Sequence, residues 1–386
     1  PGANELKMDN AVKNNVKTDG NQPVKEGNVT IPATWRNYVN TRFRNQYDPW
    51  KWAAPPAGTP KWNGTTAKVT VGAGNKITVS TPEELRGALV TYGNKGTPSA
   101  RYTIELTRDM DMNGANHNWN SCLTNNLVLD GKGHTLYNLG CYIDEDNLVY
   151  KGFLHGALGS GSMCNATIKN LNFEGAKLVY DAAVNSPGDP KAPHVGYGGL
   201  FIFPSVGTGT ITLENVHVRN SIVAQTSPRQ YEGTTIAEDG KTQITLGGAV
   251  GILGYISKEG NTSDKTPKDV SRLCQVSKCS VENSVVAGLG HPGALFTFVN
   301  GIYLKNSCGI NNTVYSMTQA HGGLLCSCSA TFSKLENCFA SGEMYAQSGS
   351  GGLVGQMTRN GDIVLCDREA GGKPNQCRLY KRRWLL

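Results

Sequence analysis

A short glycine-rich turn followed by an apolar pair recurs six times along the chain, and this repeat constrains the fold more than any other feature. Clear copies are Gly198-Gly-Leu-Phe201 and Gly351-Gly-Leu-Val354, and an earlier degenerate copy is Lys151-Gly-Phe-Leu154. A unit of this length cannot bury an apolar face alone, so successive units must stack. The second glycine, which marks the same corner of each later copy, falls at Gly199, Gly248, Gly293, Gly323 and Gly352.

A second element follows each turn and contains one small or apolar residue that we align across the repeats. It lies 14 to 19 residues after the turn glycine in five repeats and 31 in the third, where the polar stretch 257–269 indicates a surface loop. We expect the aligned residues to form one inward-facing column. These residues are Leu171, Val216, Cys279, Cys308, Cys338 and Cys366.

Short alternating strands, glycine corners and a period near 30 residues predict an all-β chain. The specific prediction is a right-handed parallel β-helix, or β-solenoid. A β-propeller is the competing repeat fold, but it needs about 40–45 residues and four strands per blade. One helix is expected from Pro82 to about Tyr92, since Ser80 or Thr81 can cap its start and Gly93 can end it. We expect this helix to cap the first coil.

Four regions follow from these patterns. Residues 1–75 form an extended aromatic and basic arm, residues 76–150 hold the capping helix and the first coils, residues 151–372 contain the repeats, and residues 373–386 are a basic tail. The net charge of +7 belongs mainly to the two ends. The repeats show no basic stripe, so nucleic-acid binding is not expected. No apolar run approaches about 18 residues, so no membrane insertion is expected either.

The cysteines and one acidic stretch could bind a metal, but a structural interpretation is favoured for both. A column shared by cysteine, leucine and valine predicts buried small side chains. Cysteines away from the column, such as Cys274 and Cys377, could form disulfides across coils. Asp109 and Asp111, with Asp130 nearby, could hold a cation, although a solvated strand end is the simpler interpretation. We therefore expect no metal and no other cofactor.

The glycine turns resemble the GLUG motif of bacterial surface proteins. Gly351-Gly-Leu-Val-Gly355 is the closest copy, whereas Gly247-Gly-Ala-Val-Gly251 departs from the motif at alanine. The upstream runs 77–85, 104–114 and 127–136 are similar to the start of that family, so the resemblance covers residues 76–370. Proteins with this motif include adhesin-like proteins and the non-catalytic part of immunoglobulin A-cleaving metallopeptidases. The resemblance implies a secreted or cell-surface β-solenoid.

The arm is rich in aromatic residues and arginine, which leaves three alternatives open. Its aromatic rings could clamp the arm onto the body of the protein, dock a second subunit, or stack on sugar rings of a glycan. The residues considered for these roles are Trp35, Arg42, Arg44, Trp50, Trp52 and Trp62.

The chain shows no recognised catalytic motif, so no catalytic residue is assigned. The second-element strands bear only one or two charged residues or histidines per repeat, and these do not form a cluster of the kind that catalysis needs. They are Lys169, Glu214, His217, Arg219 and Glu282. We therefore expect a non-enzymatic extracellular surface protein, an adhesin-like or self-assembling filament subunit. Its partners would be a cell-surface glycan or protein and other copies of itself, bound through the arm or the solenoid ends. The alternative is a polysaccharide lyase, a glycoside hydrolase or a phage tailspike built on the same fold.

Overall fold

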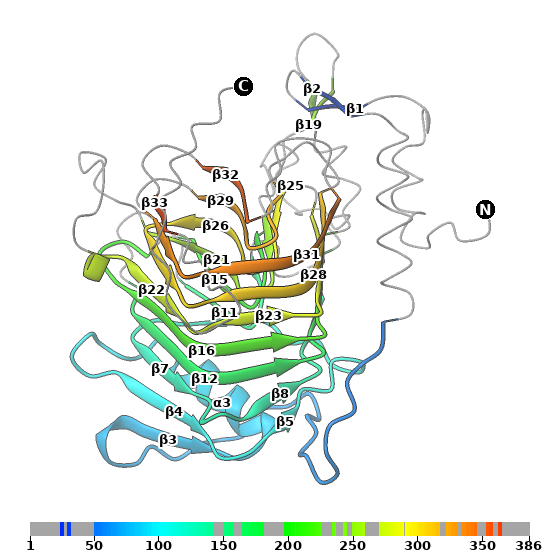
Figure 1. Cartoon of the computed structure of the whole chain (residues 1–386). Helices are drawn as coiled ribbons and strands as arrows, with labels where there is room; N and C mark the ends of the chain where they lie inside the picture. The colour runs from blue at the N-terminus through cyan, green and yellow to red at the C-terminus, as the bar shows by residue number, and fades with distance from the viewer. Residues whose placement is uncertain are drawn as a thin grey trace, which may run out of the picture.

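Strands that pair in parallel and stack in chain order make up most of the computed structural model (Figure 1). The structure describes residues 24–26, 29–31, 50–142, 150–156, 164–180, 197–204, 206–225, 234–236, 242–244, 249–258, 270–288, 290–316, 322–329, 333–345, 353–357 and 362–364. Within these residues three large sheets contain 18, 7 and 4 strands. The prediction of an all-β chain is therefore confirmed.

The largest sheet takes strands from every repeat and from the region before the repeats. Its strands are β3 (Lys76–Val79), β4 (Tyr102–Leu106), β5 (Met110–Asp111), β7 (Leu127–Asp130), β8 (Thr135–Tyr137), β9 (Gly140–Tyr142), β12 (Ala166–Glu174), β13 (Lys177–Tyr180), β16 (Ile211–Arg219), β17 (Ile222–Gln225), β22 (Cys274–Ser277), β23 (Ser280–Glu282), β24 (Val285–Gly288), β27 (Ile302–Lys305), β28 (Cys308–Ser316), β30 (Lys334–Glu336), β31 (Phe339–Tyr345) and β33 (Asp362–Val364).

Two smaller parallel sheets contain the glycine turns and the residues that follow them. The seven-stranded sheet comprises β6 (Cys122–Leu123), β11 (Leu154–His155), β15 (Phe201–Phe203), β21 (Gly254–Ser257), β26 (Phe296–Asn300), β29 (Cys326–Ser329) and β32 (Val354–Met357). The four-stranded sheet comprises β10 (Tyr150–Lys151), β14 (Tyr197–Gly198), β20 (Ala249–Gly251) and β25 (Gly290–Gly293).

The described residues also contain two short antiparallel strand pairs and two 3-10 turns. The pairs are β1 (Val24–Glu26) with β2 (Val29–Ile31), and β18 (Thr234–Ile236) with β19 (Thr242–Ile244). The turns are η1 (Ala73–Asn75) and η2 (Val270–Arg272).

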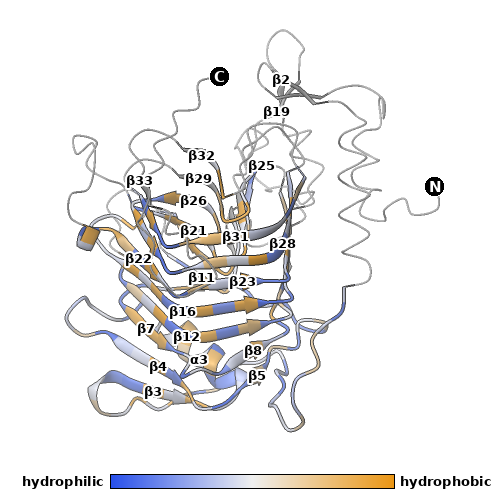
Figure 2. Ribbon diagram, in the orientation of Figure 1, coloured by the Kyte–Doolittle hydropathy of each residue, from blue (hydrophilic) through white to orange (hydrophobic). Residues whose placement is uncertain are grey.

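Equivalent residues of successive strands lie side by side, which produces continuous inner columns. One column contains only Ile, Leu and Val and is almost completely buried where side chains are described. Along β12 and β16, buried residues alternate with more exposed ones, and Figure 2 shows the matching alternation of hydropathy. The column runs through Ile77, Ile104, Leu129, Ile168, Leu213, Val276, Leu304 and Leu335.

The predicted helix is present as α3 (Pro82–Tyr92). The Thr81 side chain accepts a hydrogen bond from the Glu84 backbone, and the Glu84 carboxylate binds the Thr81 backbone in return, which forms a capping box. The apolar residues Leu85, Ala88 and Leu89 are buried, and α3 packs against β3, β4 and β6 at the start of the stack.

Candidate functional site

Residues 50–72 follow an irregular path along the first repeats and are fixed there by Trp62. This ring is 4% exposed and lies edge-on to Trp119, with ring centroids 5.3 Å apart. Its backbone N–H donates to the Asp111 carbonyl at 2.8 Å. Of the three alternatives for the arm aromatics, Trp62 fits the clamp, because a buried ring has no free face for a sugar or a second subunit.

Trp50 and Trp52 are also engaged with the protein itself. Their ring centroids are 5.0 Å apart in an edge-to-face arrangement. The Trp50 indole N–H donates to the Asn220 carbonyl at 3.1 Å, and Lys177 Nζ lies 5.5 and 5.9 Å from the two ring centroids. Both rings are only half-buried. The other residues considered for the arm, Trp35, Arg42 and Arg44, lie outside the described residues.

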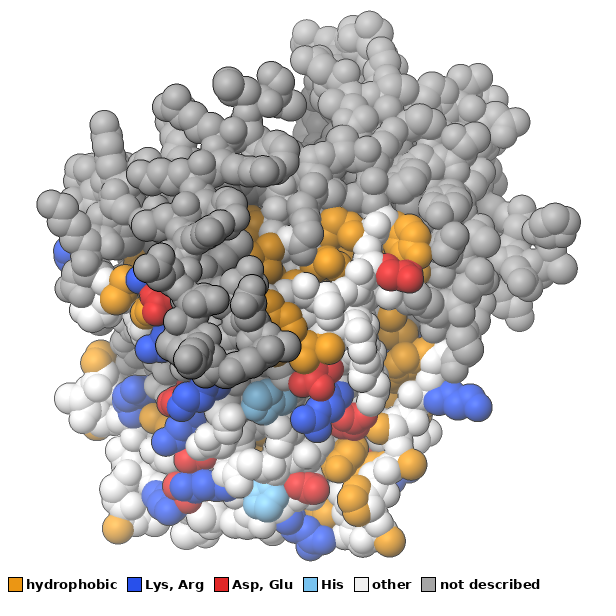
Figure 3. Space-filling view, in the orientation of Figure 1, with side chains coloured by type: hydrophobic (Ala, Val, Ile, Leu, Met, Phe, Trp, Pro, Cys, Tyr) orange, Lys and Arg blue, Asp and Glu red, His pale blue; other side chains and the backbone are white. Residues whose placement is uncertain are grey.

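A groove of about 300 Å³ lies where the arm passes over the outer face of the large sheet. The Ala53 backbone N–H donates to Oδ1 of Asn138 at 2.7 Å, and Nδ2 of Asn138 donates back to the Ala53 carbonyl at 3.1 Å. Figure 3 shows acidic, basic and histidine side chains interspersed over this face of the molecule. The groove is lined by Ala53, Ala54, Thr135, Tyr137, Asn172, Phe173, Glu174, His217 and Arg219.

Strand register explains why these side chains meet although they are far apart in sequence. Residue 172 pairs with residues 135 and 217, and residue 174 pairs with residues 137 and 219, so β8, β12 and β16 supply two outward columns of three. The intervening residues Leu136, Phe173 and Val218 are buried in the core. The same alternation that builds the core therefore presents the polar lining of the groove.

A chain of hydrogen bonds holds His217 in place at the groove. Its Nε2 lies 2.9 Å from Oδ1 of Asn215, and its Nδ1 lies 2.8 Å from the Ser280 hydroxyl. Ser280 donates in turn to Glu282, whose other oxygen lies 3.6 Å from Nε of Arg219. Both ring nitrogens of His217 are therefore held by protein atoms. Burial lowers the pKa of His217.

The three aspartates considered for a cation have separate protein partners. Asp109 accepts a hydrogen bond from the Thr135 backbone at 3.0 Å, and Asp111 accepts one from the Asn113 backbone at 2.9 Å. Asp130 lies 3.2 Å from Nζ of Lys132. Within the described ranges, no three His, Cys, Asp or Glu side chains come close enough together to hold a metal ion.

The cysteine column differs from the prediction at one position. Ser280 pairs with Cys308, so Cys279 pairs with Ser307. Ser307 is 2% exposed and is therefore the inward residue of this repeat. Cys308 instead lies on the outward register and is half-buried. Ser307 accepts a hydrogen bond from the Cys279 backbone N–H at 3.1 Å. The prediction that Cys308 belongs to the inward column is therefore wrong by one residue.

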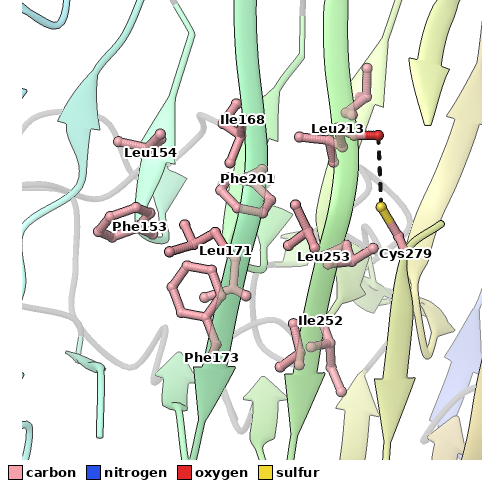
Figure 4. Packing of buried hydrophobic residues seen from close by; sticks show 14 of the residues in the cluster. Phe153, Leu154, Ile168, Leu171, Phe173, Phe201, Leu213, Ile252, Leu253 and Cys279 are labelled. Atoms are coloured by element: carbon pink, nitrogen blue, oxygen red, sulfur yellow. Dashed lines mark hydrogen bonds between the residues drawn. The ribbon is translucent and has the colours of Figure 1, made fainter. Parts of the chain in front are cut away.

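The remaining described members of the column face the interior, as Figure 4 illustrates for Leu171 and Cys279. Val216 is buried with them, and the Cys279 thiol lies 3.7 Å from the Leu213 carbonyl. Burial raises the pKa of Cys279 to about 12, so this thiol is protonated and unreactive at neutral pH. Cys366 lies outside the described residues.

The turn glycines also shift in one repeat. Gly199 faces Gly251, because a Cβ built on Gly199 would lie 2.2 Å from the Gly251 carbonyl oxygen. Gly251 in turn pairs with Gly293, and Gly293 pairs with Gly323. The corner of the third repeat is therefore Gly251, and the alignment on Gly248 is wrong by three residues. Gly248 and Gly352 themselves lie outside the described residues.

Sequence reasoning missed two features of this face. It did not bring the arm residues Ala53 and Ala54 onto the sheet, and it did not pick out Thr135, Tyr137 or Asn172. It also overlooked a column of left-handed residues at the corner between the two halves of each long strand. The signal in the sequence was an asparagine immediately before the inward residue in four repeats, Asn170, Asn215, Asn306 and Asn337. In the structure these residues have φ near 50°, and Lys278 has the same conformation in the third repeat.

No protein-family model matches the chain, and no curated protein matches it. Among solved structures, the chain is similar to the crystal structure of a "putative immunoglobulin A1 protease" from Bacteroides ovatus, with 17% identity and a TM-score of 0.35. The similarity covers 69% of this chain and 75% of that one. A likeness at this level does not indicate what this chain binds or does.

In the part of the chain that the structure describes, no helix combines the length and the apolar character needed to cross a bilayer.

Proposed function

We propose that the chain is a secreted or cell-surface protein with a right-handed parallel β-helix, and that it acts by binding rather than by catalysis. The parallel pairing of successive strands in the large sheet supports this architecture, since each long strand pairs with its equivalent one repeat later and the register shifts only locally, between Gly309 and Asn312 of β28. A stack of this kind is a rigid support for an extended binding face. The function is adhesin-like attachment to a molecule at a cell surface.

The groove between the arm and strands β8, β12 and β16 is the observation that supports this function most. Its polar groups are already held by bonds within the protein, as the contacts of His217 and Arg219 illustrate. Fixed polar groups on a rigid sheet favour recognition, because little conformational entropy is lost when a ligand binds.

Attachment can be tested with the purified chain and immobilised cell-surface material. We expect saturable binding to intact cells or to their released surface glycoproteins, with no release of reducing ends or unsaturated uronates from a polysaccharide panel. Heat-unfolded protein is the matched control. An absence of saturable binding, or turnover of any polysaccharide, contradicts the proposal.

A polysaccharide-degrading enzyme is the second candidate, and one observation favours it. Glu174 and Glu282 occupy the same outward column on either side of Arg219, so their backbones are two strand spacings, about 9–10 Å, apart. Inverting glycosidases separate their two carboxyl groups by about 6.5–9.5 Å. Turnover that is abolished in both Glu174→Gln and Glu282→Gln would establish this alternative.

Self-association through the arm or the ends of the stack is a further proposal from the sequence. Sedimentation velocity at micromolar concentration tests it, with a chain lacking residues 1–49 as the comparison. A monomer at every concentration tested contradicts it.

A further inference from the structure

The geometry points to the groove as a site for a neutral sugar, and we propose that it binds one or two uncharged hexose rings of a glycan. This inference rests on the proposed binding function and specifies its ligand. The volume of about 300 Å³ lies at the lower end of the ~300–1,000 Å³ typical of ligand pockets, which suits a small ligand unit.

The walls of the groove are fixed before any ligand arrives. Two hydrogen bonds with Asn138 hold the Ala53 backbone, and Asn138 also donates to Asp111 at 3.1 Å. On the opposite side, Asn215 and Ser280 hold the His217 ring. The side chains that a sugar would contact are therefore already ordered in the folded protein, so little conformational entropy is lost on binding.

The lining offers the groups that recognise sugar hydroxyls. A hydroxyl both donates and accepts, so it pairs well with the carboxamide of Asn172 and with the hydroxyls of Thr135 and Tyr137. The Arg219 guanidinium adds several donors in one plane. The Tyr137 ring adds apolar surface next to these polar groups, and the C–H face of a pyranose fits such surface.

The charge of the groove favours a neutral ligand over an acidic one. Arg219 is the only cation among the residues that line it, and Glu282 already pairs with it at 3.6 Å. Burial lowers the pKa of His217, which disfavours a positive charge on its ring. Glu174 contributes a negative charge, and Asp109 lies next to the groove at Thr135. A uronate or sialate would therefore meet carboxylates without an unpaired cation to bind it.

An extended peptide is disfavoured by the topology at the same place. Peptides often bind by adding a strand to an open sheet edge. Here β12 pairs with β8 and β16, β8 also pairs with β5, and β16 also pairs with β23. The main chain below the groove is thus already hydrogen-bonded on both sides. A ligand that lies over these strands is therefore recognised by their side chains, as suits a sugar.

Isothermal titration with five soluble probes tests the proposal on the full chain. Lactose, maltose, cellobiose and diacetylchitobiose are the neutral probes, and 3′-sialyllactose is the acidic counterpart of lactose. We expect at least one neutral disaccharide to bind, and to bind more tightly than sialyllactose. Failure of all four neutral probes, or tighter binding of sialyllactose than of every neutral probe, overturns the proposal.

Matched variants then locate the site. Arg219→Ala and Asn172→Ala should each weaken binding of the neutral probe about tenfold, as expected for the loss of one or two hydrogen bonds. Lys278→Ala removes a comparable exposed ion pair, with Glu214 at 3.3 Å, outside the groove, and should change affinity less than twofold. Equal effects of Arg219→Ala and Lys278→Ala contradict the assignment.

Two further measurements keep the result interpretable. Tyr137→Phe retains the ring and removes only the hydroxyl, so it provides a second variant of the groove if Asn172→Ala fails to fold. Binding of Arg219→Ala to intact cells separates this inference from the proposed function. If the wild-type protein binds cells but none of the neutral disaccharides, the adhesin-like function stands and the sugar groove is refuted.

Discussion

Nδ2 of Asn215 donates a hydrogen bond to Oδ1 of Asn170, 3.1 Å away, and the two residues occupy the same position of adjacent strands. Both backbones are in the left-handed region, with φ of 56° and 51°. Asn337 makes the same contact with Asn306 at 2.7 Å. Asparagine tolerates this conformation better than other non-glycine residues, and stacking lets each amide satisfy the next. The ladder therefore fixes the corner at which each long strand bends.

Replacement of Asn215 should separate the two contributions of this ladder. Asn215→Ala loses the hydrogen bonds and also puts at positive φ an alanine, whose side chain cannot make the local hydrogen bonds that let asparagine tolerate this conformation. We therefore expect a loss of about 2–3 kcal/mol in unfolding free energy. Asn215→Gly keeps the allowed backbone and loses only the hydrogen bonds, so about 1 kcal/mol is expected. Urea unfolding at pH 7 measures both. Equal losses in the two variants contradict a role for the left-handed backbone.

The asparagine ladder also shows how far the repeat could be predicted from sequence. Glycine turns and apolar alternation predicted strands and their stacking, because both signals are local. The predicted register fails at Cys308, because the inward residue of that repeat is the one directly after Asn306, which is Ser307. It fails again at Gly248, where the run Gly247-Gly-Ala-Val-Gly-Ile-Leu-Gly254 offers several glycines and only strand pairing selects Gly251.

The candidate site could not be predicted in the same way. Asn172 and His217 are 45 residues apart and become neighbours only through the exact offset between β12 and β16. Insertions make that offset differ from one repeat to the next. The contact between Ala53 and Asn138 depends on how an irregular segment lies on the finished sheet, which no periodic pattern in the sequence encodes.

Trp62→Ala should destabilise the protein strongly because the indole fills a buried position beside Trp119. We expect a loss of about 3–5 kcal/mol, the usual cost of removing a buried aromatic side chain. Guanidinium unfolding followed by circular dichroism measures it. Limited trypsin digestion should also cut at Lys51 and Lys61 sooner in the variant, since the clamp that holds residues 50–72 is lost.

Trp50→Ala is the matched control for the clamp. Its ring is half-buried and makes one indole hydrogen bond, to Asn220, so about 1–2 kcal/mol is expected. If Trp50→Ala costs as much as Trp62→Ala, the arm is held along its whole length and Trp62 is not its anchor.

The thiols should differ in reactivity according to their register. Cys308 lies outward and half-buried, and burial raises its pKa as well, but the two inward thiols are more enclosed: burial raises the pKa of Cys338 to about 11 and that of Cys279 to about 12. In native protein at pH 8, iodoacetamide should modify Cys308 at least about tenfold faster than Cys279, as read by peptide mass spectrometry. In 6 M guanidinium the rates should become equal. Fast native modification of Cys279 would place it on the outer face and contradict the observed register.

Glu105 should make the stability of the stack depend on acid pH. Nζ of Lys76 lies 2.7 Å and Nζ of Lys132 lies 3.0 Å from the carboxylate oxygens of Glu105. The bond from Lys76 contributes most, and together the two lysines hold the pKa of Glu105 below its usual value. A carboxyl with a lowered folded-state pKa contributes stability above its unfolded pKa of about 4.3, and this contribution is lost as the pH falls through the folded value.

Urea midpoints of the wild type and Glu105→Gln between about pH 7 and pH 3 test this dependence. The wild type should exceed the variant by a constant margin down to about pH 5, and the margin should shrink below that, because protonation of Glu105 removes the same interactions as the substitution. Lys76→Gln removes the lysine that lowers the pKa of Glu105 most, so it should reduce the loss of stability at acid pH. Curves for wild type and Glu105→Gln that stay parallel down to pH 3 would show that the Glu105 ion pairs contribute nothing to the stability of the first strands.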